Sequence, residues 1–326
     1  MPSSNLRGVL SVDPPSLMSY DAVSPLLTWR GAVEAIRAGH ASARPNQADI
    51  LIGPSKGLLL NRAAFIEDLG YAVKAETVLP ANAAEGLPSV QGAVLLFDAK
   101  TGSLRAVIDS KLVTEFKTAA DSVLAAEILA RPESRHLLIV GAGAVAKNLA
   151  RAYSAAFPRL ERISIWARRQ QQAAELVSSL NDLGPDLSVA EDLTSAAASA
   201  DIVSSATMAR EPIILGRWVR AGTHVDLIGA FTPDMRESDD ELIAKAKIYV
   251  DFRDTTVSFV GDLTQPIASG VISRTDILGD LYDLVAAGRP VRGSASDITV
   301  FKNGGGAHLD LMIANYVAEV VSRAKQ

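Results

Sequence analysis

The chain has 326 residues, of which 48% are hydrophobic, so it is long enough for two domains or for one domain with a large insertion. It contains no cysteine, which excludes disulfides, thiolate chemistry and cysteine-ligated zinc, and its four scattered histidines predict no metal site. The net charge is −5 without a basic tract, which argues against nucleic acid as a partner. Because we find no membrane-length apolar run and no signal peptide, we expect a cytoplasmic protein that does not bind a membrane.

The first third of the chain, residues 1–115, mixes helical and strand patterns. Helical spacing runs over residues 29–43, and residues 98–102 form a turn between two apolar runs, which predicts a hairpin. An alanine-rich helix is expected at residues 118–130, as the connection into the next domain. The segments with strand character are residues 48–52, 58–60, 72–78 and 90–97.

From about residue 136, strand and helix patterns alternate, and this rhythm is typical of a parallel sheet covered by helices. A final helix at residues 308–323 is expected to return to the first domain. The predicted strands are residues 137–140, 162–166, 187–190, 202–205, 225–228, 248–250 and 298–301, and the helices between them are residues 144–156, 169–180 and 194–199.

The most informative stretch lies between His136 and Tyr153, where an apolar run enters a glycine-rich turn and a helical pattern follows without a break. This is the pattern of a phosphate-binding corner, in which free N–H groups and the helix dipole favour an anion. The first glycine allows the tight turn, the second lets the backbone approach a pyrophosphate, and the last alanine lets helix and strand pack closely. We therefore predict a dinucleotide site at Gly141, Gly143, Ala144, Val145 and Ala146.

The nature of the dinucleotide depends on the end of the second strand of this unit. NAD-selective sites usually place an acid there, whereas this strand ends in Ala167, Arg168 and Arg169. Two guanidinium groups suit a 2′-phosphate, so we favour NADPH, with NADH as the other possibility. The alternative is that both arginines begin a solvated helix. Thr207, after a later strand, either contacts the cofactor or caps a helix.

Several segments together resemble the ornithine cyclodeaminase and μ-crystallin family of imine and amino-acid oxidoreductases. They occur in the order typical of that family and cover most of residues 60–315. The matching segments are Val73-Lys74, Leu79 to Asn82, Gly92 to Asp98, Thr101-Gly102, Thr114 to Ser122, Gly141 to Ala146, Ile165 to Arg168, Ala200 to Thr207, Gly222 to Gly229 and Phe301 to Asp310.

The resemblance implies an α/β fold with two parts. A central Rossmann-type parallel-sheet domain at residues 119–307 would bind NAD(P)H. A discontinuous α+β domain, made of residues 1–118 and 308–326, would bind the substrate and join two copies in a homodimer. Members of the family either reduce imines with NAD(P)H or convert ornithine to proline with release of ammonia.

The resemblance also places three cations at the substrate. Lys74 matches a family lysine that faces the substrate carboxylate and the reacting nitrogen; buried there, its pKa would be lowered so that it could relay a proton. Lys117 stands where most of the family has arginine, which keeps the charge but loses the bidentate geometry. The arginine that the family carries near residues 44–52 is missing or shifted, and Arg62 is an alternative cation or a solvent-facing residue.

Two further segments bear on the reaction. Cyclodeaminases carry an aspartate two residues after Gly229, which we assign to the cofactor site, and Phe231 stands there instead, with Asp234 displaced by three residues. We therefore favour imine reduction. In the glycine-rich turn before the last helix, Asp310 either caps that helix, which we favour, or orients the substrate amine. His308 is interpreted as a loop residue.

These features predict an NADPH-dependent reductase of a cyclic α-imino acid, with Δ1-pyrroline-2-carboxylate giving L-proline as the first choice. Lys74 and Asp310 are the candidate catalytic residues, and Arg62, Lys74 and Lys117 the candidate substrate-binding residues. Three alternatives stay open. They are an ornithine cyclodeaminase that uses Asp234, an alanine-dehydrogenase-like enzyme, and a non-catalytic NADP(H)-binding protein.

Overall fold

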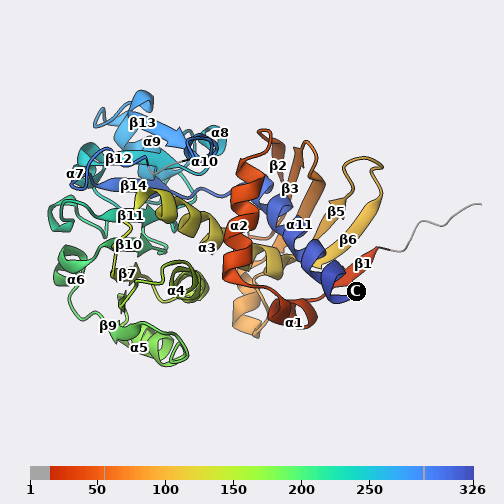
Figure 1. Cartoon of the computed structure of the whole chain (residues 1–326), viewed down its shortest axis with the longest axis horizontal. Helices are drawn as coiled ribbons and strands as arrows, with labels where there is room; N and C mark the ends of the chain where they lie inside the picture. Colours follow the sequence, from red (N-terminus) through yellow and green to blue (C-terminus); the bar gives the residue numbers. More distant parts are fainter. Residues whose placement is uncertain (1–14, 55, 289–290) are drawn as a thin grey trace, which may run out of the picture.

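The computed structural model describes residues 15–54, 56–288 and 291–326 and contains two β-sheets that lie side by side (Figure 1). The N-terminal third of the chain forms one sheet, and the strands that follow form the other. Within these described ranges, no helix is long and apolar enough to cross a membrane.

The first sheet has six strands in the order β1-β6-β5-β4-β3-β2. Strands β2 to β6 form an antiparallel meander, and β1 pairs with β6 in parallel. The expected hairpin joins β5 to β6, and its turn is held by Asp98, which accepts hydrogen bonds from the backbone N–H groups of Lys100 and Thr101. The strands are β1 (Ser16–Met18), β2 (Asn46–Ile52), β3 (Leu58–Ile66), β4 (Gly70–Val78), β5 (Val90–Phe97) and β6 (Leu104–Asp109).

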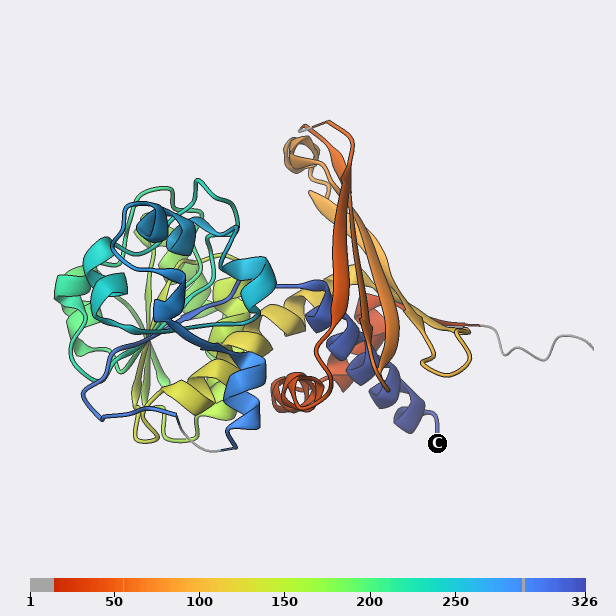
Figure 2. The ribbon, with the colours of Figure 1, turned by 90° about the horizontal axis from the view of Figure 1, so that it is seen from above.

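Two helices from opposite ends of the chain cover one face of this sheet. They are α2 (Trp29–His40), which is capped by the side chain of Thr28, and α11 (Ala307–Ala324). Figure 2 shows both helices on the same side of the sheet, with the described chain leaving the other side open. The C-terminal helix therefore completes the N-terminal unit, as the pattern of residues 308–323 predicted.

The second sheet is parallel throughout and has the order β13-β12-β14-β11-β10-β7-β8-β9. The chain runs outward from β7 in one direction through β8 and β9, and from β10 in the other, so the crevice between β7 and β10 is the switch point at which such sheets bind ligands. The predicted α/β fold is confirmed. The strands are β7 (His136–Val140), β8 (Arg162–Trp166), β9 (Asp186–Val189), β10 (Ile202–Ser205), β11 (His224–Leu227), β12 (Lys247–Val250), β13 (Ile277–Asp280) and β14 (Thr299–Lys302).

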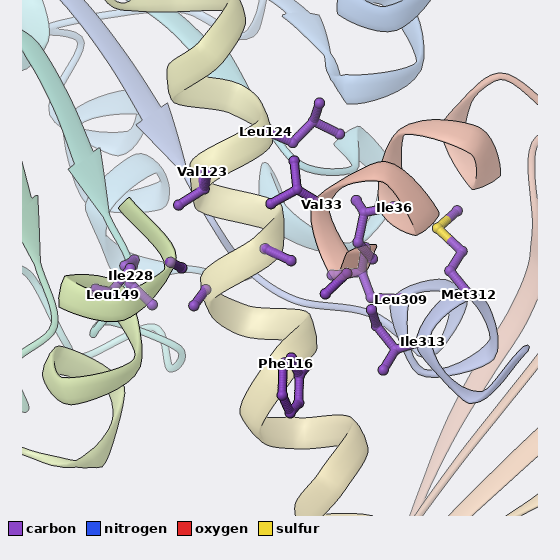
Figure 3. Packing of buried hydrophobic residues seen from close by; sticks show 14 of the residues in the cluster. Val33, Ile36, Phe116, Val123, Leu124, Leu149, Ile228, Leu309, Met312 and Ile313 are labelled. Atoms are coloured by element: carbon purple, nitrogen blue, oxygen red, sulfur yellow. The ribbon is translucent and has the colours of Figure 1, made fainter. Parts of the chain in front are cut away.

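The helix α3 (Ser110–Leu129) lies between the two sheets and contributes to a core that is continuous across them. Figure 3 shows Val33 and Ile36 of α2 and Leu309, Met312 and Ile313 of α11 on one side of α3, with Leu149 and Ile228 on the other. This helix begins eight residues before the expected start at Thr118, because the side chain of Asp109 accepts a hydrogen bond from Lys111 N and caps it. The expected domain boundary at residue 118 falls inside α3.

Several short elements of the second unit were not predicted. They are too short to carry a clear period, and α9 even contains Pro266, so their positions follow from packing on the sheet. The remaining helices are α1 (Tyr20–Val23), α4 (Ala144–Ala156), α5 (Gln170–Ser178), α6 (Leu193–Ser199), α7 (Asp240–Lys245), α8 (Arg253–Thr256), α9 (Gly261–Ala268) and α10 (Leu281–Ala286), with 3-10 turns η1 (Ser24–Leu26), η2 (Pro80–Glu85), η3 (Gly216–Trp218) and η4 (Arg274–Asp276).

One buried charge in α3 gives a prediction about stability. The carboxylate of Asp121 is fully buried, and neither oxygen has a hydrogen-bond partner among the described residues. Burial raises its pKa well above the ordinary value, and the nearby charges of Asp251 and Asp226 add to this rise. Because the folded-state pKa is raised, Asp121 destabilises the fold increasingly as the pH rises above the unfolded value of about 4.

We expect Asp121→Asn to raise the free energy of unfolding by roughly 1 to 3 kcal/mol at pH 8 and by less at pH 5. Denaturant titrations of both proteins at the two pH values measure this difference. The exposed Asp254→Asn is the matched control and should change little at either pH. A destabilised Asp121→Asn protein at pH 8 would contradict the prediction.

Candidate active site

The predicted phosphate-binding corner lies between β7 and α4. Gly141 has a φ of +125°, and a side chain there would place its Cβ 2.6 Å from the carbonyl oxygen of Ala206, so only glycine fits. Gly143 is the N-cap of α4 and leaves its first N–H groups without a side-chain partner, while Ala146 is buried against the sheet. The corner therefore offers free donors at a helix N-terminus, as an anion requires.

A cavity of about 730 Å³ opens at this corner and extends along the ends of β8 and β10. It brings together Gly141, Gly143, Arg168, Arg169 and Thr207, all predicted to contact the cofactor. Its glycine cradle, helix N-terminus and size fit a dinucleotide. Ala144 and Val145, in the first turn of α4, face a second cavity described below.

The two arginines at the end of β8 are exposed, and no carboxylate directly follows that strand. Arg169 is the N-cap of α5, and its Nε donates to Gln172 at 3.0 Å. Both guanidinium groups line the cavity. The local geometry therefore accommodates both interpretations of the sequence, a helix start and a phosphate contact.

Thr207 and Gly229 follow the adjacent strands β10 and β11. Of the two interpretations of Thr207, the helix cap is excluded, because no helix follows it in the described chain before η3. Its hydroxyl donates to Glu237 at 2.7 Å. A side chain at position 229 would collide with the carbonyl oxygen of Thr207. The backbones of the two strand ends are therefore held unusually close to each other.

The second part of the site is a buried ion cluster made from three distant elements. Lys74 of β4 and Lys117 of α3 both contact Asp310 of α11, with Nζ–Oδ1 distances of 3.2 and 2.6 Å. All three side chains are less than a tenth exposed. Asp310 makes no capping hydrogen bond, so the favoured capping interpretation is wrong. The fold joins the predicted catalytic residues Lys74 and Asp310 and adds Lys117.

The pKa values of the two lysines diverge. Burial lowers the pKa of Lys117 to about 7, although the charge of Asp310 opposes this shift. Burial also acts to lower the pKa of Lys74, but the charges of Asp310 and Glu76 outweigh it, so that pKa is raised. The expected lowered pKa at Lys74 is therefore wrong, and the perturbed amine is Lys117. Burial opposes ionisation of Asp310 too, but the two ammonium groups keep its pKa below the ordinary value.

Arg62 lies beside Lys74 in the register of β3 and β4, but it is an ion-pair partner within the sheet. Its Nε and its terminal amino group lie 3.0 and 2.9 Å from Asp49 of β2. Arg44 pairs with Asp280 instead, with an N–O distance of 2.7 Å. Of the three predicted cations, only the two lysines share an acidic partner.

Sequence reasoning missed two polar residues of this cluster. Glu76 lies 3.3 Å from Lys74 through its carboxylate, and Thr114 accepts a 3.4 Å contact from the same ammonium group. Both line a cavity of about 500 Å³ that also reaches Ala144 and Val145, so they connect the lysines to the cofactor corner. The two-residue period of β4 places Glu76 on the face of Lys74 and is the signal that was available.

Three other residues differ from expectation or lie elsewhere. His308 is not in a loop: it is buried in the first turn of α11, where its Nδ1 lies 3.1 Å from the side-chain oxygen of Gln47. Phe231 is half exposed, and Asp234 is exposed and pairs with Arg210. Asp234 has no recorded contact with the lysine cluster among the described residues.

Comparisons with known proteins identify the family of the chain. The profile of the ornithine cyclodeaminase/mu-crystallin family matches residues 57–325. A Δ1-pyrroline-2-carboxylate reductase of Paracoccus denitrificans is 58% identical over 308 residues, which cover 94% of this chain and 98% of the relative.

Two solved structures have the same architecture over nearly the whole chain. One is the Thermococcus litoralis Δ1-pyrroline-2-carboxylate reductase in complex with NADH and L-proline, with a TM-score of 0.88, 29% identity and coverage of 95% of this chain and 98% of that one. The other is an archaeal alanine dehydrogenase dimer with bound NAD, with a TM-score of 0.87, 26% identity and coverage of 96% and 97%. The chain belongs to the ornithine cyclodeaminase/mu-crystallin family, as its sequence motifs predicted.

Proposed function

We propose that this chain is an NAD(P)H-dependent reductase of a cyclic imino acid, with Δ1-pyrroline-2-carboxylate giving L-proline as its reaction. The observation that carries the proposal is the buried Lys74–Asp310–Lys117 cluster next to a dinucleotide corner. The 58% identity with a reductase of that name, over nearly its whole length, supports the choice of substrate.

The charges of the cluster suit a zwitterion. Lys74 and Lys117 are balanced by Asp310 and Glu76, so a ligand with one carboxylate and one protonated imine adds no net charge. The ligand carboxylate takes lysine contacts that Asp310 otherwise makes, and the acidic side chains face the iminium nitrogen. Protonation of that nitrogen makes the imine carbon a better hydride acceptor. The reduced nicotinamide, when bound, supplies the hydride.

The two lysines have different roles in the proposed reaction. Lys74, whose pKa is raised, stays charged and holds the carboxylate throughout the neutral range. Lys117, with a pKa of about 7, exchanges protons near physiological pH and keeps the buried site balanced as the substrate changes charge. The surrounding protein contributes orientation and exclusion of water.

The assay that tests the function follows oxidation of NADPH and of NADH with Δ1-pyrroline-2-carboxylate and identifies the product. L-proline formed with matched oxidation of cofactor supports the proposal. Ammonia released from ornithine without net cofactor consumption would favour the cyclodeaminase, and turnover of a 2-oxo acid with ammonia would favour the dehydrogenase. Tight NADPH binding without turnover of any of these substrates would favour a non-catalytic NADP(H)-binding protein.

The lysine cluster gives a prediction about catalysis. Lys74→Met should lower kcat/KM for the imine about 100-fold or more, because the substrate carboxylate loses a buried cation. The dissociation constant of NADPH, measured by fluorescence, should change less than about threefold, since Lys74 lies outside the dinucleotide cavity. Retained turnover in this variant would contradict the role given to Lys74.

Lys117→Arg is the matched variant, because it keeps the charge and removes the titration. In the wild type, kcat/KM should fall as the pH rises through about 7, where Lys117 loses its charge in the free enzyme. An arginine stays charged over this range, so the pH profile of the variant should not show this fall in kcat/KM. A change that is due to ionisation of the substrate itself would appear in the profiles of both proteins. Identical pH profiles would rule out Lys117 as the titrating group.

We propose NADPH as the preferred cofactor, since Arg168 and Arg169 face the cavity at the ribose end and no acid directly follows β8. Arg168→Ala/Arg169→Ala should weaken NADPH binding about 10-fold to 100-fold and leave NADH binding nearly unchanged. Titrations of both cofactors measure this. No loss for either cofactor would assign the arginines to the helix surface, and an equal loss for both would show that they bind a part other than the 2′-phosphate; either result would contradict the proposal.

We also propose a homodimer joined through the open face of the first sheet. Ile50, Leu51 and Ile52 of the edge strand β2 are each more than half exposed, as is Leu17 of β1. Successive strand residues point to opposite faces, so Leu51 points away from the face to which Ile50 and Ile52 point, and all three leave apolar surface at this edge in one copy. The sedimentation velocity of the wild type and of Leu51→Glu measures the oligomeric state, and a monomeric wild type would contradict the proposal.

A further inference from the structure

Another buried acid, Glu237, lies outside the lysine cluster and contacts Thr207, which lines the dinucleotide cavity. Its Oε1 accepts hydrogen bonds from Ser205 Oγ at 2.7 Å and from the backbone N and Oγ1 of Thr207 at 2.8 and 2.7 Å. Its Oε2 accepts from Gly229 N at 2.6 Å and Ala230 N at 3.4 Å. One carboxylate therefore binds the ends of both β10 and β11.

A second buried acid, Asp262, binds the backbone of Glu237. Asp262 Oδ1 accepts from the backbone N of Glu237 at 2.8 Å, and its Oδ2 lies 3.5 Å from the ammonium group of Lys302. Lys302 also donates to Leu227 O at 2.9 Å, at the end of β11. All three side chains have no exposed surface, so two buried carboxyl groups share one buried cation.

The geometry indicates which form of Glu237 is present. Burial raises the pKa of Glu237, although the charge of Lys302 opposes this shift. Three of the five groups around the carboxylate are backbone N–H groups, which can only donate, and they reach both of its oxygens. The ionised form accepts from all three, and the two hydroxyl groups donate to it as well. The network of Glu237, Asp262 and Lys302 thus carries a net negative charge beneath the two strand ends.

The position of this charge relative to the cofactor follows from the sheet. In this class of fold the adenine ribose lies at the end of the second strand, which is β8 here, and the dinucleotide extends across the switch point. Its nicotinamide half would therefore lie toward the ends of β10 and β11. Thr207 lines the same cavity as Arg168, so the strand ends that Glu237 holds border its other half. The nicotinamide ring carries a positive charge only in its oxidised form.

We propose that Glu237 is a positioning residue for the nicotinamide half of the cavity and that the net negative charge of its network favours the oxidised cofactor over the reduced one. The inference deepens the proposed function, on which it rests, because a site that stabilises the charge developing on the ring promotes hydride donation. Nothing in the lysine cluster is required for it.

The experiment measures the dissociation constants of NADPH and NADP⁺ without substrate, for the wild type and for Glu237→Gln. We expect the preference for NADP⁺ relative to NADPH to fall about tenfold in the variant, the size of effect that loss of one buried charge near the ring gives. Because no substrate is present, the result does not depend on which imine the enzyme reduces.

Two variants separate charge from structure. Ser205→Ala removes one donor to Glu237 without changing the charge, so it should leave the ratio of the two dissociation constants unchanged. Asp262→Asn removes a charge of the network without a contact in the cavity, so it should move the ratio in the same direction as Glu237→Gln. It also provides the test if Glu237→Gln does not fold.

An equal weakening of both cofactor forms in Glu237→Gln and Asp262→Asn would overturn the inference, because a purely structural role affects both forms alike. A wild type that binds neither form would overturn the cofactor proposal, and the inference with it. An altered ratio in a protein that does not reduce pyrroline-2-carboxylate would support the inference while the choice of substrate failed.

Discussion

The site depends on the pairing of buried charges from distant parts of the chain. An ammonium group that is taken out of water must have a partner at close range, and Lys74 and Lys117 share the carboxylate of Asp310. The three residues come from β4, α3 and α11, so the pairing is complete only when the C-terminal helix packs against the N-terminal sheet. The cluster therefore forms only because the two ends of the chain fold together into one unit.

Two other buried acids, Glu237 and Asp251, bind backbone N–H groups rather than ammonium groups. Glu237 holds the ends of β10 and β11, and Asp251 accepts hydrogen bonds from Gly304 N and Gly305 N in the turn before α11. Loops at the ends of strands are mobile unless their N–H groups are bound, and a buried carboxylate binds several of them at once. Thr207, which lines the dinucleotide cavity, is thus held by contacts within the protein, which reduces the ordering that binding requires there.

The sequence could predict those parts of the site whose contacts are local in the chain, and it could not predict the contacts between distant residues. The corner at Gly141 and Gly143 is a local pattern, and its turn, helix and free N–H groups are where the spacing placed them. The lysine partners of Asp310 lie far away in sequence, and the favoured cap at Asp310 was wrong for that reason. The helix cap that was one of the two interpretations of Thr207 fails in the same way, because this residue binds the distant Glu237. Glu76 could have been found from the strand period, whereas Glu237 could not, because its five donors meet only in the folded sheet.

Lys117 shows how a departure from a motif acquires a meaning only in context. By sequence alone, lysine in place of arginine meant a weaker carboxylate clamp. In the structure the position is fully buried beside a second cation, where arginine would stay charged at every accessible pH and lysine has a pKa of about 7. Under the proposed reaction, a site that receives both a carboxylate and a proton gains from an amine that titrates near neutrality. Lysine at position 117 therefore binds the substrate carboxylate less tightly than arginine would, but its charge changes with pH near neutrality. Lys74 supplies the charge that stays fixed.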